Sequence, residues 1–158
     1  MSPEPVNTGR LAGAVAGGLV AGLALSAVMI AGEKASGKPS ELIELERKTA
    51  AKLAIPTPPA DECASLGEQI VTHGGHLALS ALAGVAYAAI VDEDSDGATS
   101  GALFGLAFFI AAYGVTGPAL GVAPLPWREQ PLRAVQHPVV HTLFGLAMAF
   151  FARKARGR

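Results

Sequence analysis

Four histidines are the residues of this chain with the clearest capacity for chemistry. His73 and His76 are three residues apart, and His137 and His141 are four apart. Either spacing places both rings of a pair on one face of a helix. Because neutral imidazole binds zinc, copper and haem iron well, the two pairs together predict a metal or haem site made by all four rings. Two other roles stay open, namely hydrogen bonding between neighbouring helices and the handling of protons.

The chain offers few other groups for such chemistry. Cys63 is the only cysteine, so an intrachain disulfide and a cysteine-rich zinc site are excluded. The sequence "DEDSDG" at 92–97 resembles the first half of a calcium loop, but position twelve of that loop is Leu103, which excludes an EF-hand. A weak cation-binding turn and a solvated acidic connection both stay open. The sequence also lacks a glycine-rich phosphate loop and a nucleophile elbow, so we expect a protein that is not an enzyme.

The elements that must position the histidines are long apolar segments. Of the 158 residues, 51% are hydrophobic, and the formal net charge of −1 excludes the basic field that nucleic-acid binding requires. A bilayer core about 30 Å thick needs roughly 20 apolar helical residues. A secretory signal is the alternative for the first segment, although its 21 residues from Leu11 to Ala31 exceed a usual signal region. We expect membrane spans at 11–31, 70–91, 98–116 and 134–152.

These segments predict an all-α integral membrane protein, a four-helix bundle that forms a single domain over residues 1–158. The insert at 39–55 predicts an amphipathic helix that Ser40 caps, lying either at the membrane interface or on the bundle itself. Gly117-Pro118 is expected to end the third span. Pairs of glycines four residues apart favour close helix packing inside the bundle, with self-association through these glycine faces as the alternative. The pairs are Gly13 and Gly17, Gly18 and Gly22, and Gly101 and Gly105.

The number of spans predicts where the histidines and the chain ends lie. In a four-span chain the second and fourth helices run in the same direction, so all four histidines should lie at one membrane face. Basic residues after the last span favour a cytoplasmic C-terminus, and they are Arg153, Lys154, Arg156 and Arg158. An even number of spans then places both termini in the cytoplasm.

Several of these features occur together in one known group of proteins. His76 and His141 each head a span, and the sequences "GALFGLA" at 101–107 and "GPALGVAPLPWRE" at 117–129 lie between them. This pattern resembles the YagU-like family of uncharacterised bacterial inner-membrane proteins, a domain of unknown function. The resemblance implies a multi-pass helical protein of the bacterial inner membrane, and it implies no particular activity.

Three functions follow as expectations. The leading one is a non-enzymatic scaffold or accessory subunit of a membrane complex, whose partners are the lipid bilayer and either another membrane protein or a second copy bound through the glycine faces. The second is metal or haem binding at one membrane face, for redox chemistry or metal handling, by His73, His76, His137 and His141. The third is a pathway for a small solute or protons that forms on oligomerisation.

Overall fold

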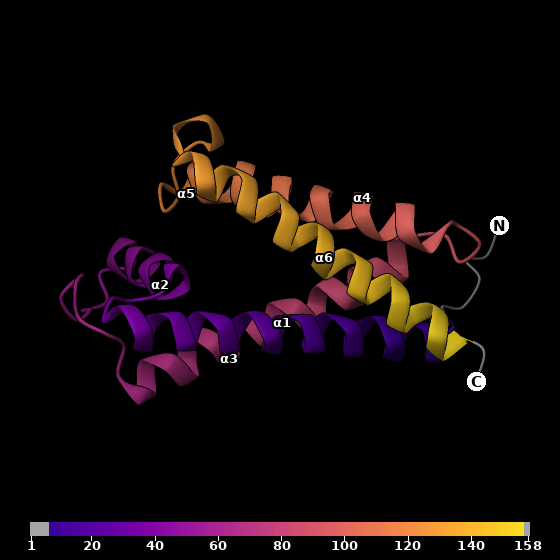
Figure 1. The fold of residues 1–158 in the computed structure, drawn as a ribbon, viewed down its shortest axis with the longest axis horizontal. Helices are drawn as coiled ribbons and strands as arrows, with labels where there is room; N and C mark the ends of the chain where they lie inside the picture. Colours follow the sequence, from indigo (N-terminus) through magenta and orange to yellow (C-terminus); the bar gives the residue numbers. More distant parts are fainter. Residues whose placement is uncertain (1–6, 157–158) are drawn as a thin grey trace.

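The computed structural model describes residues 7–156, and within that range the chain forms helices joined by connections, with no strand. This confirms the all-α fold class. The two short helices η1 (Ile110–Thr116) and α5 (Gly117–Leu120) continue α4 (Gly97–Phe109) directly. The 3₁₀ turn η2 (Pro126–Arg128) precedes the last helix. The main helices are α1 (Thr8–Ser36), α2 (Glu41–Lys52), α3 (Leu66–Ile90), α4 (Gly97–Phe109) and α6 (Pro131–Arg156) (Figure 1).

Polar side chains define where the helices begin. The Ser40 hydroxyl accepts a hydrogen bond from the Ile43 amide at 3.5 Å, which confirms the predicted cap of α2. Asp96 caps α4 in the same way, accepting from the Thr99 amide at 2.8 Å. Each cap satisfies an amide that has no partner within its own helix, so these starts are encoded locally.

The third apolar segment is longer than the sequence indicated. After α4, the π-helix η1 (Ile110–Thr116) leads directly into α5 (Gly117–Leu120), so the prediction that the helix ends at Gly117-Pro118 is wrong. A proline ring normally clashes with the carbonyl one turn earlier, and the wider turn of a π-helix relieves that clash. The helical segment ends instead at Gly121, whose φ of 67° lies in the left-handed region.

The last helix also begins earlier than expected. α6 starts at Pro131, and Pro138 lies inside it instead of near its beginning. Because Pro131 occupies the first position, where no amide is needed, it suits a helix start. The resulting 26 residues are enough to cross a bilayer, which the shorter expected segment did not ensure.

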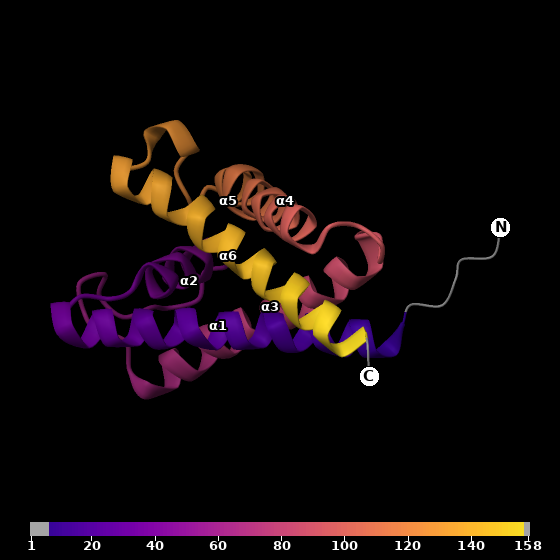
Figure 2. The same ribbon diagram turned by 45° about the vertical axis from the view of Figure 1, so that its right-hand side comes forward.

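The four long helices do not close into a ring. α1 packs along both α3 and α6, α6 packs along α4, and α3 barely touches α6. The helices converge where α1 begins and α6 ends, and they spread apart at the other end, where α2 lies between them (Figures 1 and 2). The expected four-helix bundle is therefore not confirmed, and an open arrangement takes its place.

Glycine residues allow the central helices to pack backbone to backbone. A Cβ atom at Gly17 would lie 2.7 Å from the carbonyl oxygen of Ala147 in α6. A Cβ atom at Gly101 of α4 would likewise lie 2.8 Å from the carbonyl oxygen of Gly145. The expected glycine faces thus serve packing within the chain, and an oligomer would need a different surface.

Three helical segments are long and apolar enough to cross a membrane, namely Thr8–Ser36, Gly97–Leu120 and Pro131–Arg156. α3 was also expected to span but is not among them. Its first three turns carry polar side chains, which lower the hydropathy of an otherwise apolar helix, and these are Glu68, Gln69, Thr72, His73 and His76.

Candidate functional site

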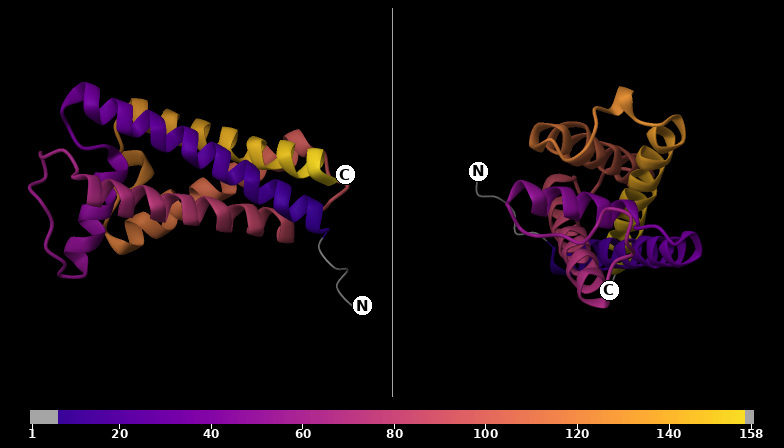
Figure 3. Two further views of the ribbon diagram at one scale, coloured as in Figure 1. Left: turned by 90° about the horizontal axis from the view of Figure 1, so that it is seen from below. Right: turned by 90° about the vertical axis from the view of Figure 1, so that its left-hand side faces the viewer.

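The four histidines lie in the first half of α3 and of α6, with His76 and His141 close to the middle of these helices. α3 and α6 both begin at the open end of the molecule, and α2 crosses it (Figure 3). The right-hand view of Figure 3 looks onto this end. Both histidine pairs therefore lie in the half of the molecule nearer the open end, which agrees with the predicted direction of the helices, and their position at one membrane face stays a prediction.

His137 and Arg133 of α6 both link this helix to Glu41 of α2. The Nε2 atom of His137 donates to Glu41 Oε2 at 2.9 Å, because a carboxylate can only accept. The other carboxylate oxygen of Glu41 pairs with Arg133 Nε at 2.7 Å. The His137 ring also meets the Tyr113 ring edge to face, with 4.3 Å between centroids. The hydrogen bond from His137, together with the Arg133 charge, holds the pKa of Glu41 below its usual value against the opposing effect of partial burial.

His141 is held by its own helix and by aromatic rings. Its Nδ1 atom donates to the carbonyl oxygen of His137, one turn earlier, at 2.8 Å. Its ring centroid lies 5.5 Å from that of Phe109 and 6.1 Å from that of Phe108. This arrangement fixes the orientation of the ring and places the hydrogen on Nδ1, so that Nε2 of a neutral ring remains an acceptor.

His76 links α3 to α1. Its Nδ1 atom lies 3.1 Å from the hydroxyl oxygen of Ser26, within hydrogen-bond distance. Ser80 donates to the carbonyl oxygen of His76 at 2.8 Å. His76 therefore acts here as a hydrogen-bonding contact between two apolar helices, one of the roles left open by the sequence.

His73 differs from the other three histidines. Its side chain is buried, with 7% of the residue exposed, and neither ring nitrogen has a hydrogen-bond partner. The Gln69 and Thr72 side-chain oxygens are also buried without a partner. Thr72 and His73 follow Gln69 by three and four residues, so both lie on the face of α3 that carries Gln69. A buried polar group without a partner costs roughly 1–3 kcal/mol, so this face has an unmet capacity for a ligand or water.

The histidines do not gather around one point. Among residues 7–156, no three His, Cys, Asp or Glu side chains come close enough to hold a metal ion together. His137 and His76 instead contact Glu41 and Ser26, on different elements. A site formed by all four rings stays a prediction that needs its own test.

Two polar anchors at this end were not anticipated from the sequence. Arg47 of α2 makes a two-pronged ion pair with Glu68, at 2.6 and 2.9 Å, and donates to the carbonyl oxygens of Pro59 and Glu62 at 2.8 Å each. Glu33 of α1 accepts from the Ser40 amide at 3.2 Å and from the Ala64 amide at 2.7 Å. These contacts fix the insert to α1 before it and to α3 after it.

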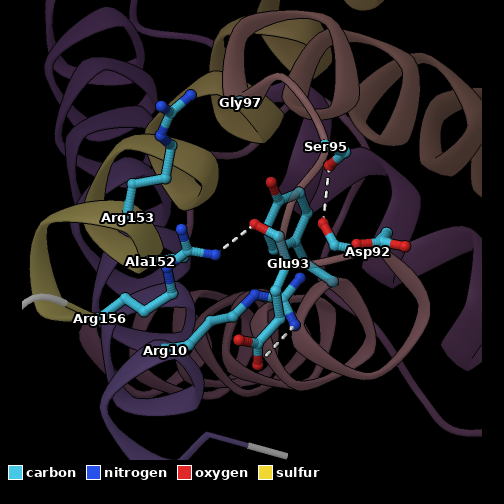
Figure 4. Close-up of a pocket in the computed structure, with 9 residues that line it drawn as sticks. Arg10, Asp92, Glu93, Ser95, Gly97, Ala152, Arg153 and Arg156 are labelled. Carbon is cyan, nitrogen blue, oxygen red and sulfur yellow. Dashed lines mark hydrogen bonds and ion pairs between the residues drawn. The ribbon is translucent and has the colours of Figure 1, made fainter.

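The opposite end carries a compact cluster of charges (Figure 4). Arg10 donates to the carbonyl oxygens of Ala88, at 2.6 Å, and Val91, and lies 3.9 Å from Glu93. Arg156 pairs with Asp94 at 3.6 Å. The cavity between these residues holds about 10 Å³, room for one water molecule at most. The acidic connection between α3 and α4, residues 91–96, thus contacts both Arg10 of α1 and Arg156 of α6. These contacts suit a structural role, holding the two helices together.

Comparison with protein-family models, curated proteins and solved structures finds no match for this chain. The functional argument therefore depends on the geometry alone.

Proposed function

We propose that this chain is a four-span integral membrane protein that serves as a non-enzymatic scaffold or accessory subunit of a membrane complex. The observation that carries this proposal is the outward direction of its apolar side chains. Within the three apolar segments, only 28%, 11% and 17% of the most hydrophobic stretch is buried inside the protein. Exposed large side chains such as Val28, Leu103 and Leu143 need an apolar solvent, which a bilayer supplies.

α3 is the proposed fourth span. Its 25 residues extend about 37 Å at the usual rise per residue, which exceeds the bilayer core. It runs antiparallel to α1 and packs along it (Figure 3), while Leu79, Leu82 and Val85 remain exposed. Its polar first turns would lie at the membrane face, beside the anchored insert.

The scaffold role is supported by how the polar side chains are used. Three polar side chains each contact a part of the chain that is distant in sequence. Glu41 of α2 contacts α6, Arg47 of α2 contacts the connection before α3, and Arg10 of α1 contacts the end of α3. The proposed setting is the bacterial inner membrane, with both termini cytoplasmic. The resemblance to YagU-like proteins supports the membrane, and the basic residues at the end of α6 support the orientation.

The test is capture of the tagged protein from membranes after brief chemical cross-linking in living cells, followed by mass spectrometry. A scaffold should retain one membrane protein at a fixed ratio after solubilisation in mild detergent. Unrelated membrane proteins of similar abundance serve as the control for random capture. A chain that is purified alone and stays monomeric in detergent and in bilayers would contradict this role.

His73 supports a second candidate, the binding of a metal ion or haem at the open end. Both of its buried ring nitrogens lack a partner, and His76 follows one turn later on the same helix face. The test is metal analysis with a visible absorption spectrum on protein that carries no histidine tag. Near-stoichiometric metal or a haem band that is lost in His73→Ala but retained in His137→Ala would support a site at His73. Colourless, metal-free protein would contradict it.

A further inference from the structure

We propose that the groove between the start of α4 and the end of α6 binds an anionic phospholipid of the surrounding bilayer. The groove has an open volume of about 530 Å³, within the range of roughly 300–1,000 Å³ that is usual for small-molecule sites. Its floor is apolar and consists of Leu146, Ala149 and Phe150. This inference rests on the proposed membrane location.

The charged side chains that line the groove are both basic. Arg153 and Lys154 both line it, and none of its lining residues is acidic. The Lys154 ammonium lies over the Phe150 ring at 5.8 Å, so an apolar residue of the groove positions it. Lys154 has no ion-pair partner among residues 7–156. A cation held beside an apolar groove suits a ligand with a negative head and an apolar tail.

Arg153 adds a second cation that is only loosely engaged. Its Nη1 atom lies 3.9 Å from Asp96, and 62% of its side chain is exposed. Asp96 itself accepts from the Thr99 amide as the cap of α4, so its carboxylate is directed toward that helix start. Asp94 pairs with Arg156 and Glu93 with Arg10, while the Asp92 carboxylate accepts from the Asp94 amide at 2.8 Å. The guanidinium therefore remains able to bind a phosphate from the groove side.

The position of the groove along the molecule fits the headgroup of a lipid. Three of the four Lys and Arg residues of α6 lie in its last turn, directly after the apolar floor of the groove, and the fourth, Arg133, pairs with Glu41 near the other end of the helix. Basic pockets between helices at the cytoplasmic face are where anionic headgroups bind, because anionic lipids are enriched in that leaflet. Acyl chains would follow the exposed Phe150 and the half-buried Leu146 toward the bilayer centre.

The test uses a tryptophan placed in the groove and lipids that quench it. Phe150→Trp in a Trp127→Phe background leaves one tryptophan, which retains the ring beneath Lys154. The protein is reconstituted in phosphatidylcholine bilayers that contain the same small fraction of brominated phosphatidylglycerol or brominated phosphatidylcholine. We expect the phosphatidylglycerol to bind beside the tryptophan about fivefold more strongly or better, since one basic residue contributes roughly that factor.

Matched charge changes show whether the groove causes this preference. Arg153→Gln with Lys154→Gln should abolish it, whereas Lys34→Gln with Lys38→Gln, two exposed lysines at the other end, should leave it unchanged. Equal quenching by the two lipids, or a preference that survives loss of Arg153 and Lys154, would overturn the lipid site alone. The absence of quenching by either lipid would overturn the membrane location as well.

Discussion

Glu41 is the residue that connects the insert to the last helix, through His137 and Arg133. No local rule identifies this link, because 96 residues separate Glu41 from His137 and a single sequence contains no signal for their contact. The histidine was recognisable as a chemical group, but its partner depends on how α2 folds back across the open end. The same holds for Arg47, whose charge in the sequence is that of an ordinary helix surface residue.

Glu41→Gln should destabilise the protein most at neutral pH and least in acid. The pKa of Glu41 is lowered by folding, so its contribution is complete above its unfolded value of about 4.5 and is lost as the pH falls through its lower folded value. Because about a third of the side chain is exposed, at 33%, we expect a loss of about 1 kcal/mol. The free energy of unfolding, determined in mild detergent at several pH values, measures this loss. Glu44→Gln, one turn later, is the control, and an equal loss in the two variants would contradict the assignment.

Arg47→Gln should release the connection between α2 and α3. The substitution leaves the Glu68 carboxylate buried without its partner, and it removes the donors to Pro59 and Glu62. Breaking a buried ion pair in this way costs about 3 kcal/mol or more. The natural Cys63 is exposed and next to Glu62, so a nitroxide attached there reports motion of the connection. Its spectrum should sharpen in Arg47→Gln.

The exposed neighbour Lys48 provides the control for this experiment. Lys48→Gln removes the same charge from the same helix, but no residue of the connection contacts it through an ion pair. The nitroxide at Cys63 should therefore stay as restricted as in the unaltered protein. If the nitroxide at Cys63 were equally mobile in Arg47→Gln and Lys48→Gln, Arg47 would not be the residue that holds the connection in place.

At the scale of the helix, the sequence predicts a start that a side chain caps better than it predicts an end. Ser40 caps α2 because its side chain reaches an amide three residues away, and that geometry is the same in any protein. The end of the third segment was misplaced because Pro118 reads as a helix breaker, whereas the π-helix before it admits the ring. The periodicity of apolar residues does not distinguish that wider turn from an ordinary α-helical turn.

Gly17→Ala tests the close contact between α1 and α6. The added methyl group would meet backbone atoms of Ala147 and Met148, which cannot rotate away, so the helices must separate. We expect a loss of about 1–3 kcal/mol, the usual cost of overpacking. Gly32→Ala in the same helix is the control, since nothing lies within 4 Å of the position its Cβ would take. That change should stabilise the helix slightly. Unfolding in detergent should rank the two variants in this order, and the reverse order would contradict the packing.

At the scale of the whole molecule, the apolar lengths of three segments were readable from composition, while the role of α3 was not. Its polar first turns suit a membrane face, a surface helix or a ligand site equally well by hydropathy. Packing along α1 favours a span, because the two helices run antiparallel over most of their length (Figure 3). The question is therefore whether the two ends of α3 lie on opposite sides of the membrane.

Two thiols, one beyond each end of α3, decide this with a reagent that cannot cross membranes. Cys63 precedes α3 and is exposed, and Asp94→Cys in a Cys63→Ser background places a thiol after it, at a side chain that is 95% exposed. If α3 spans, an impermeant maleimide added to sealed cells labels only one of the two. Cytoplasmic termini make that one Cys63, and the inverted orientation makes it position 94. Labelling of both from outside, or of neither before lysis, would place α3 along one face and leave three spans, with the chain ends on opposite sides. Because the spanning test depends only on whether the two positions differ, it remains decisive in either orientation.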